Sequence, residues 1–359
     1  MLLEQHECII LIIFSFFIQI FLYPSLIKLF LLWQNGGQPI RDDGPKSHII
    51  KAGTPTMGGI GIIFTVIITT IIYMLFYNKS VNNSLIWACI FILSSYGLIG
   101  FIDDYIKIKY RNSYGISGKS RLITQFILAL ISILFMKISI LDISDSFLNK
   151  IIYYIINIYK HHNYVNFPFN IKINLGIFYY FFAAIVIVGA ANATNLTDGL
   201  DGLVSVPLII NFAYFSLISC GIIKYSNINH DLLNISSISY LSCICIGSCL
   251  GFLWYNAHPA KIFMGDVGSL SLGGISGMIA VSLNIEILFF FASGLFVIEA
   301  LSVIIQVVYY RIYKKRIFLM APIHHHYEKS GLTESQIVIR FWILSLIFPL
   351  FSFILFNYK

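Results

Sequence analysis

The chain has 359 residues, of which 58% are hydrophobic and only 11% are charged, and its mean hydropathy is +0.84. A soluble globular domain carries about 25% charged residues, so this composition excludes a soluble protein and predicts an integral membrane protein. The formal net charge is +7, and the placement of the basic residues is more informative than their number.

Several apolar segments are long enough to cross a bilayer as helices, because a crossing needs roughly 20 apolar residues. The first segment has no basic region before it and no small-residue cleavage site, so we interpret it as a retained span and not as a signal peptide. No linker or soluble domain separates the segments, and we expect one all-α, polytopic membrane domain over residues 1–359. We predict about ten spans, near 9–33, 57–77, 84–102, 122–141, 176–191, 202–223, 236–254, 267–283, 286–309 and 337–356.

All six cysteines fall inside these apolar segments and have no zinc-type spacing with histidines. We therefore expect them to be packing residues and not disulfide partners. They are Cys8, Cys89, Cys220, Cys243, Cys245 and Cys249.

The basic residues divide unevenly between alternate loops. Odd-numbered loops carry 14 Lys and Arg residues, and even-numbered loops carry 5. By the positive-inside rule, the odd loops are cytoplasmic and both termini are periplasmic. The acidic and histidine clusters described next all fall in odd loops, which predicts a cleft at the cytoplasmic face. The long fourth loop, about 142–175, with His161 and His162, is expected to be an external surface element.

The first cluster is Asp103 and Asp104, at the end of the third apolar segment. A carboxylate at the bilayer centre costs about 2.5–3.5 kcal/mol, so the pair belongs near the interface. A solvated helix end is one interpretation. However, negative charge at a helix C-terminus opposes the macrodipole and adjacent carboxylates repel, which favours a cationic partner or a metal.

The second cluster lies in Asn195–Gly202, before the sixth segment. Asp198 and Asp201 share one helical face. They could cap that helix, or the glycines could let the backbone approach a ligand that the carboxylates bind.

The third cluster lies in Asn256–Ser269. Asp266 could cap the next helix, or it could hold a cation against a phosphate bound by Lys261 and by glycines at a helix N-terminus. Phe263 could stack on a base, although a single phenylalanine is more often a packing residue.

The fourth cluster is the run His324, His325 and His326, with Glu328 close behind. Three adjacent histidines point in different directions, so they cannot easily bind one ion; a zinc site would need other ligands. One or two could meet a phosphate. Under the simplest interpretation, most of the lysines contact lipid headgroups. The best candidates to bind a pyrophosphate are those whose loops lie nearest the acidic clusters, namely Lys51, Lys107 and Lys119.

Together these motifs resemble one family, the phospho-N-acetylmuramoyl-pentapeptide-transferases, and they occur in the family's order along nearly the whole chain. The wider superfamily of polyprenyl-phosphate sugar-1-phosphate transferases shares the aspartate motifs. The stretches Gly53–Gly59 and Ala321–Glu328, in contrast, favour the peptidoglycan branch. The matching stretches are Gly53–Gly59, Phe101–Tyr105, Asn195–Gly202, Phe263–Leu270, Ala321–Glu328 and Arg340–Ile343.

The resemblance implies Mg²⁺-dependent transfer of phospho-MurNAc-pentapeptide from UDP-MurNAc-pentapeptide to undecaprenyl phosphate, with release of UMP. It implies a homodimer in the bacterial inner membrane and no nucleic-acid partner. Asp266 corresponds to the magnesium ligand, with Asp103 and Asp104 as further candidates, and Asp103 corresponds to the proposed base. The uridine pocket corresponds to Gly199, Leu200, Asp201, Asn256 and Phe263. The rest of the polar cleft corresponds to Lys51, Lys119, Asn195, Asp198, His324 and His325, with His326 beside them; Lys107 remains a substrate-binding candidate by its loop.

Two other functions remain open from the residues alone. A sister transferase would use UDP-GlcNAc as its donor. A metal or proton transporter would bind its cargo near the bilayer midplane, where this chain has few ionisable groups; Lys28, Lys137 and Glu299 are the chief exceptions.

Overall fold

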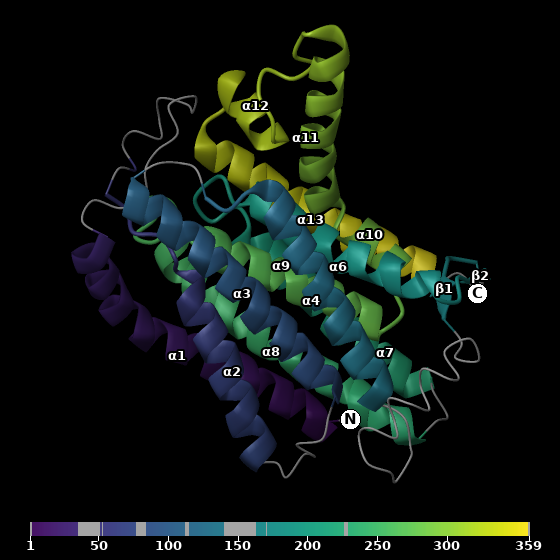
Figure 1. Ribbon diagram of the computed structural model, residues 1–359. Helices are drawn as coiled ribbons and strands as arrows, with labels where there is room; N and C mark the ends of the chain where they lie inside the picture. Colours follow the sequence, from purple (N-terminus) through teal and green to yellow (C-terminus); the bar gives the residue numbers. More distant parts are fainter. Residues whose placement is uncertain are drawn as a thin grey trace.

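The computed structural model describes residues 2–34, 51, 53–76, 84–111, 115–139, 163–169, 171–225 and 229–357. Within these ranges the chain is a helical bundle with one short hairpin (Figure 1). The helices are α1 (Leu2–Gln34), α2 (Gly59–Phe76), α3 (Ser84–Tyr110), α4 (Gly118–Ser139), α6 (Phe178–Thr197), α7 (Ser205–Tyr225), α8 (Asn229–Asn256), α9 (Gly265–Ser282), α10 (Glu286–Ala292), α11 (Gly294–Tyr313), α12 (Ile323–Lys329) and α13 (Glu334–Asn357).

Eight of these helices are long and apolar enough to cross a membrane: α1, α2, α3, α4, α6, α8, α11 and α13. This confirms the polytopic all-α class. The number of ten crossings and the side of each terminus remain predictions. The span predicted near 286–309 is divided into α10 and α11, because the backbone of Ser293 leaves the helical conformation between them.

Helix α9 lies at the centre of the bundle, and almost its whole length is buried. Its apolar character is diluted by glycine and serine, which instead let neighbouring helices approach closely. A Cβ on Gly274 would lie 2.7 Å from the ring of Tyr96 on α3, and one on Gly273 would lie 2.6 Å from the Thr194 hydroxyl on α6. This packing places the N-terminus of α9, and with it Asp266, against α3 and α6.

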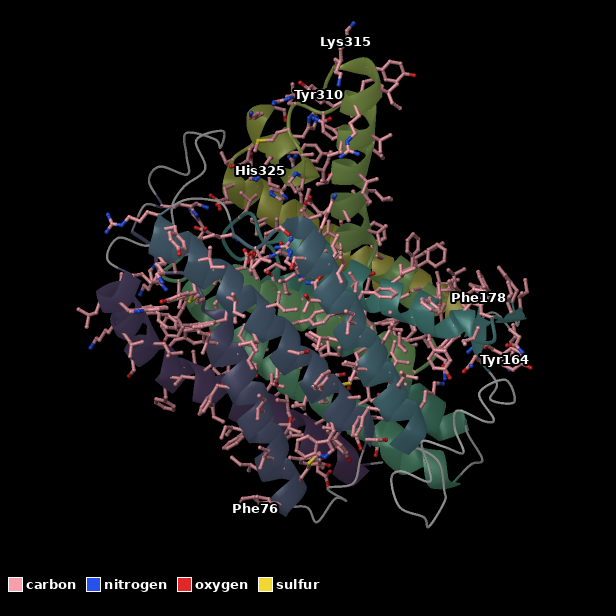
Figure 2. All side chains as sticks on the ribbon, in the orientation of Figure 1. Phe76, Tyr164, Phe178, Tyr310, Lys315 and His325 are labelled. Atoms are coloured by element: carbon pink, nitrogen blue, oxygen red, sulfur yellow. The ribbon has the colours of Figure 1, made fainter. Side chains whose placement is uncertain are left out.

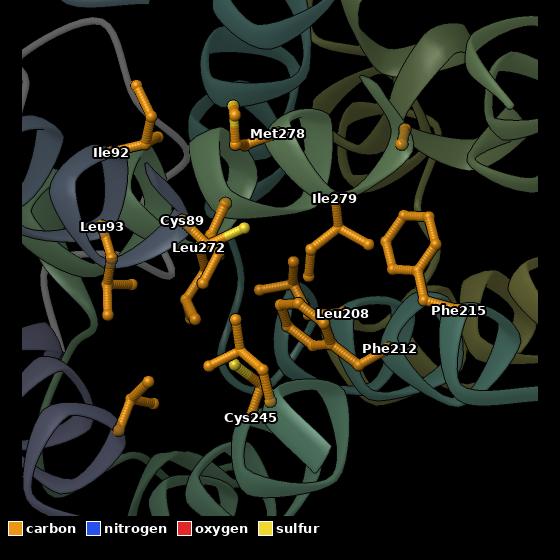
Figure 3. Packing of buried hydrophobic residues seen from close by; sticks show 14 of the residues in the cluster. Cys89, Ile92, Leu93, Leu208, Phe212, Phe215, Cys245, Leu272, Met278 and Ile279 are labelled. Atoms are coloured by element: carbon orange, nitrogen blue, oxygen red, sulfur yellow. The ribbon is translucent and has the colours of Figure 1, made fainter. Parts of the chain in front are cut away.

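The main hydrophobic core joins α3, α7, α8 and α9 (Figure 3). Leu93, Phe212 and Leu272 are among its fully buried members. All six cysteines are free. Cys89, Cys243, Cys245 and Cys249 are buried and pack in the core, as expected, whereas Cys8 is half-buried and Cys220 is exposed.

A second, smaller core lies where α11 projects from the bundle (Figure 1). It packs Leu200 and Leu203, which follow α6, against Leu295 of α11 and against α13. Figure 2 shows His325 of α12 at this end of the bundle and Phe76 of α2 at the opposite end. The second core therefore fixes α11 and α13 beside the loop after α6.

The hairpin pairs β1 (Tyr164–Asn166) with β2 (Lys172–Asn174) in antiparallel register. It is the described part of the long fourth loop. His161 and His162 lie outside the described residues. Asn166 ties the hairpin to the bundle by donating a hydrogen bond to the carbonyl of Asn284, at 3.0 Å.

Candidate active site

Three aspartates meet where the end of α3 approaches the start of α9. Asp103, Asp104 and Asp266 each present a carboxylate oxygen within 4.8 Å of the others. Two glycines make this approach possible. A Cβ on Gly100 would lie 2.3 Å from the carbonyl oxygen of Asp266, and one on Gly265 would lie 2.5 Å from Oδ2 of Asp104. Gly265, which directly precedes Asp266 in the sequence motif, therefore leaves room for the carboxylate of Asp104 on α3.

Basic side chains neutralise this carboxylate cluster, which we define as Asp103, Asp104 and Asp266. The Lys107 Nζ atom lies 2.5 Å from Asp103 Oδ2, 2.9 Å from Asp266 Oδ2 and 3.9 Å from Asp104 Oδ1. Arg121 contacts Asp266 at 3.4 Å. The positive charges offset the repulsion between the carboxylates, as the sequence interpretation required.

The carboxylate cluster fits a hard divalent cation such as Mg²⁺, which prefers carboxylate oxygens and keeps room for substrate phosphates. Among the described residues, the buried Oδ1 atom of Asp104 has no hydrogen-bond donor, and a buried oxygen of this kind calls for a partner. Asp103 already accepts a hydrogen bond from the backbone N–H of Ile116 at 2.6 Å. The donor set is therefore oxygen-rich and only partly satisfied by protein groups.

Asn195, on the last turn of α6, orients Asp266 from the other side. Its Nδ2 group donates to Asp266 Oδ1 at 2.7 Å and to the Ser269 hydroxyl at 2.9 Å. Asp198 follows directly after α6. Burial, together with the negative charges of Asp266 and Asp201, raises the pKa of Asp198 to about 8. At neutral pH this carboxyl group therefore holds its proton and can donate a hydrogen bond.

A second polar cluster surrounds Asp201. The ammonium of Lys51 donates to Asp201 Oδ1 at 2.7 Å and to Glu334 Oε1 at 2.6 Å. Asp201 Oδ2 lies 3.1 Å from both His258 Nδ1 and the backbone N of Ala260. Burial alone would lower the pKa of Lys51, but its hydrogen bonds to the two carboxylates outweigh this and hold the pKa above its ordinary value. Lys51 thus stays charged.

Asn256 and Phe263 hold the loops around this second cluster. Asn256 accepts from the backbone N of Gly202 at 3.0 Å and donates to the carbonyl of Ile262 at 2.9 Å. The backbone of half-buried Phe263 exchanges hydrogen bonds with Pro55 and Gly58, at 2.8 Å each. The motif that contains Gly58 and the motif that contains Phe263 are therefore joined through main-chain contacts.

The three histidines point to three different partners, as expected from their adjacency. His324 Nδ1 lies 3.0 Å from Glu299 Oε1, and His325 Nδ1 lies 2.7 Å from Glu328 Oε2. His326 accepts from the backbone N of Leu319 at 3.1 Å. Only His324 is fully buried, beside the loop that carries Asp198 and Asp201.

The structure brings most of the predicted residues together, with one shift in the basic set. Lys119 is exposed at the start of α4, whereas Arg121 reaches Asp266. Sequence reasoning did not select Glu334 or His258 as site residues. A first-turn acid such as Glu334 resembles an ordinary helix start, so the sequence offered no distinguishing signal. Glu299 did carry a signal, because an ionisable residue within an apolar span is costly and usually functional.

Comparisons with known proteins identify relatives of this chain. A family model described as Glycosyl transferase family 4 matches residues 85–284. A phospho-N-acetylmuramoyl-pentapeptide-transferase of Rickettsia bellii (strain RML369-C) is 48% identical over 91% of this chain and 86% of its own length. The enzymes of the same name from Rickettsia felis (strain ATCC VR-1525 / URRWXCal2) and Rickettsia prowazekii (strain Madrid E) are also 48% identical over the same shares.

Proposed function

Because the chain belongs to the phospho-N-acetylmuramoyl-pentapeptide-transferase family, we propose that it transfers phospho-MurNAc-pentapeptide from UDP-MurNAc-pentapeptide to undecaprenyl phosphate. The products are UMP and the first lipid intermediate of peptidoglycan. One observation supports this proposal most strongly. The segment Asn195–Gly202, which begins on the last turn of α6, links the carboxylate cluster, through Asn195, to the second polar cluster, through Asp201. The proposed phosphate-transfer site and the proposed nucleotide site would therefore adjoin.

Asp266, with Asp103 and Asp104, would hold Mg²⁺. When bound, the ion would neutralise negative charge on the diphosphate of the donor. The protein's own cations contribute in the same direction, since Lys107 and Arg121 already lie against Asp266 and can position phosphate oxygens. Asp103 is the candidate base for a proton on the lipid phosphate.

The proposed reaction is a direct displacement. An oxygen of the lipid phosphate forms a bond to the phosphorus that carries the sugar, and the bond from that phosphorus to the bridging oxygen breaks. UMP leaves with the bridging oxygen and its electron pair.

The second polar cluster is the proposed site of the nucleotide. Asp201 would accept from the imide N–H of uracil, and the half-buried ring of Phe263 would stack on the base. The Asp201 carboxylate already accepts from Lys51 and from the backbone N of Ala260, so its position is fixed before the donor arrives. Gly199 and Leu200 complete this side of the pocket.

We further propose that the cleft faces the cytoplasm and that the protein acts as a homodimer in the inner membrane. Helices α7 and α9 would then complete ten crossings with the eight candidate spans. The nucleotide sugar is a cytosolic molecule, whereas the acceptor phosphate is held at headgroup depth. A site at one end of several helices is where both can meet.

The test is a UMP-release assay with purified protein, Mg²⁺, undecaprenyl phosphate and either UDP-MurNAc-pentapeptide or UDP-GlcNAc. Release with the first donor alone is the expected result; release with UDP-GlcNAc alone would assign the sister reaction. Asp266→Asn should abolish turnover without unfolding, and Asp103→Asn should reduce turnover far more than donor binding. Metal-stimulated ion flux in proteoliposomes without UMP release would instead support a transporter.

A further inference from the structure

A buried acid–imidazole pair lies outside both polar clusters. Glu299 belongs to the apolar helix α11, and His324 belongs to the short helix α12. Glu299 Oε1 and His324 Nδ1 are 3.0 Å apart, and both side chains are 0% exposed. A buried glutamate raises the free energy of a membrane helix. If the contact were only structural, apolar residues of similar size would stabilise the protein at least as well.

The pair is incompletely satisfied. Among the described residues, neither Glu299 Oε2 nor His324 Nε2 has a hydrogen-bond partner. An ionised carboxylate only accepts hydrogen bonds, so an ionised Glu299 places the proton of His324 on Nδ1. The free Nε2 atom is then the one that remains for a group outside the pair.

His324 Nε2 faces the loop that connects the two polar clusters. A Cβ on Gly199 would lie 2.2 Å from Nε2, so the imidazole fits there only because residue 199 is glycine. Gly199 lies between Asp198 and Asp201. The carboxylate of Glu299, on the helix that projects from the bundle, is therefore connected through one imidazole to the loop that carries Asp198 and Asp201.

We propose that Glu299 is a positioning residue: it fixes the tautomer and orientation of His324 so that Nε2 is presented, as a hydrogen-bond acceptor, to the Asp198–Asp201 loop and to an N–H or O–H group of the donor bound there. This inference rests on the proposed function for its substrate. It adds a residue that touches neither substrate nor metal but determines which ring nitrogen of His324 is available.

The first test is Glu299→Gln in the UMP-release assay. Glutamine has nearly the same shape, but its amide can accept from or donate to Nδ1, so it no longer enforces one tautomer. We expect kcat to fall about 10- to 100-fold, the range found when partners that orient metal-bound histidines are removed, and the donor KM to stay within about threefold. A kcat within twofold of wild type would overturn the proposal.

A double-mutant comparison separates positioning from packing. If Glu299 acts only through His324, then Glu299→Gln should add no further loss to His324→Gln. Multiplying losses would contradict the proposal. Ser302→Ala is the matched control, because Ser302 is buried on the same helix and its hydroxyl donates only to the carbonyl of Glu299; its kcat should stay within twofold of wild type.

A measurement on the wild-type protein covers the case in which the Glu299 variants do not fold. Solid-state NMR of the ¹⁵N-histidine-labelled protein, with the spectrum of His324→Gln subtracted, should show a proton on Nδ1 of His324. A neutral ring protonated only on Nε2 would refute the proposal. This measurement needs no substrate, so it tests the role of Glu299 independently of activity. If the wild-type protein releases no UMP from UDP-MurNAc-pentapeptide, that result refutes only the proposed function.

Discussion

Removal of the Lys107 amino group should make the protein bind a divalent cation more tightly while it stops turnover. The ammonium lies 2.9 Å from Asp266 Oδ2 and 2.5 Å from Asp103 Oδ2, and both aspartates belong to the cluster that would hold the cation. Lys107 and the metal ion therefore compete for the same negative charge. Lys107→Met keeps much of the length of the side chain and removes only its cationic end.

Coulomb's law sets the scale of the expected effect. Two unit charges 4 Å apart interact by about 4 kcal/mol at the effective dielectric constant of about 20 that suits protein sites. Because rehydration of the displaced ammonium offsets part of this, we expect at least about 1.4 kcal/mol to remain, which is a tenfold gain in affinity. The Lys107 side chain is 14% exposed, so its loss should also destabilise the metal-free protein by a few kcal/mol, because the carboxylates lose their counter-charge.

The assay is Mn²⁺ binding to purified protein, followed by electron paramagnetic resonance, together with the melting temperature in detergent with and without Mn²⁺. Lys109→Met is the matched control: it removes the same charge from the same helix, but Lys109 lies over the rings of Tyr105 and Tyr110. The control should bind Mn²⁺ like wild type. Equal or weaker Mn²⁺ binding by Lys107→Met than by the control would refute competition at this cluster.

Three further outcomes are expected. Gly199→Ala should reduce UMP release more than tenfold, because its Cβ would collide with a buried imidazole, whereas Gly189→Ala, where a Cβ meets nothing within 4 Å, should be silent. Glu334→Gln should raise the donor KM several-fold with a smaller change in kcat, since it removes a carboxylate that accepts from Lys51 at 2.6 Å; an unchanged KM would exclude Glu334 from the donor pocket. Burial raises the pKa of Glu286, which lies outside the eight candidate spans, to about 7. The folded protein then binds this proton more tightly than the unfolded chain, so stability should fall by about 2 kcal/mol from pH 5 to pH 8, and the melting temperature of Glu286→Gln should depend less on pH.

The amino-acid sequence by itself determined the class of fold and most members of the site. Long apolar segments can satisfy their backbone hydrogen bonds in a bilayer only as helices, and the described part of the chain has eight such helices. The aspartates at Asp103, Asp104 and Asp266 could be selected because carboxylates next to apolar runs are costly without a partner. The different directions of the three histidines also followed from their adjacency.

Only the tertiary structure decided which charges meet. Arg121 reaches Asp266 while Lys119 is exposed, a difference of two residues that depends on how α4 is rotated against α9. Glu334 joins Lys51 across 283 positions of sequence, and Glu299 finds His324 on another helix. Hydropathy and spacing constrain each helix separately, whereas the partner of a buried charge depends on helix packing, which here is set by close approaches at glycines such as Gly273.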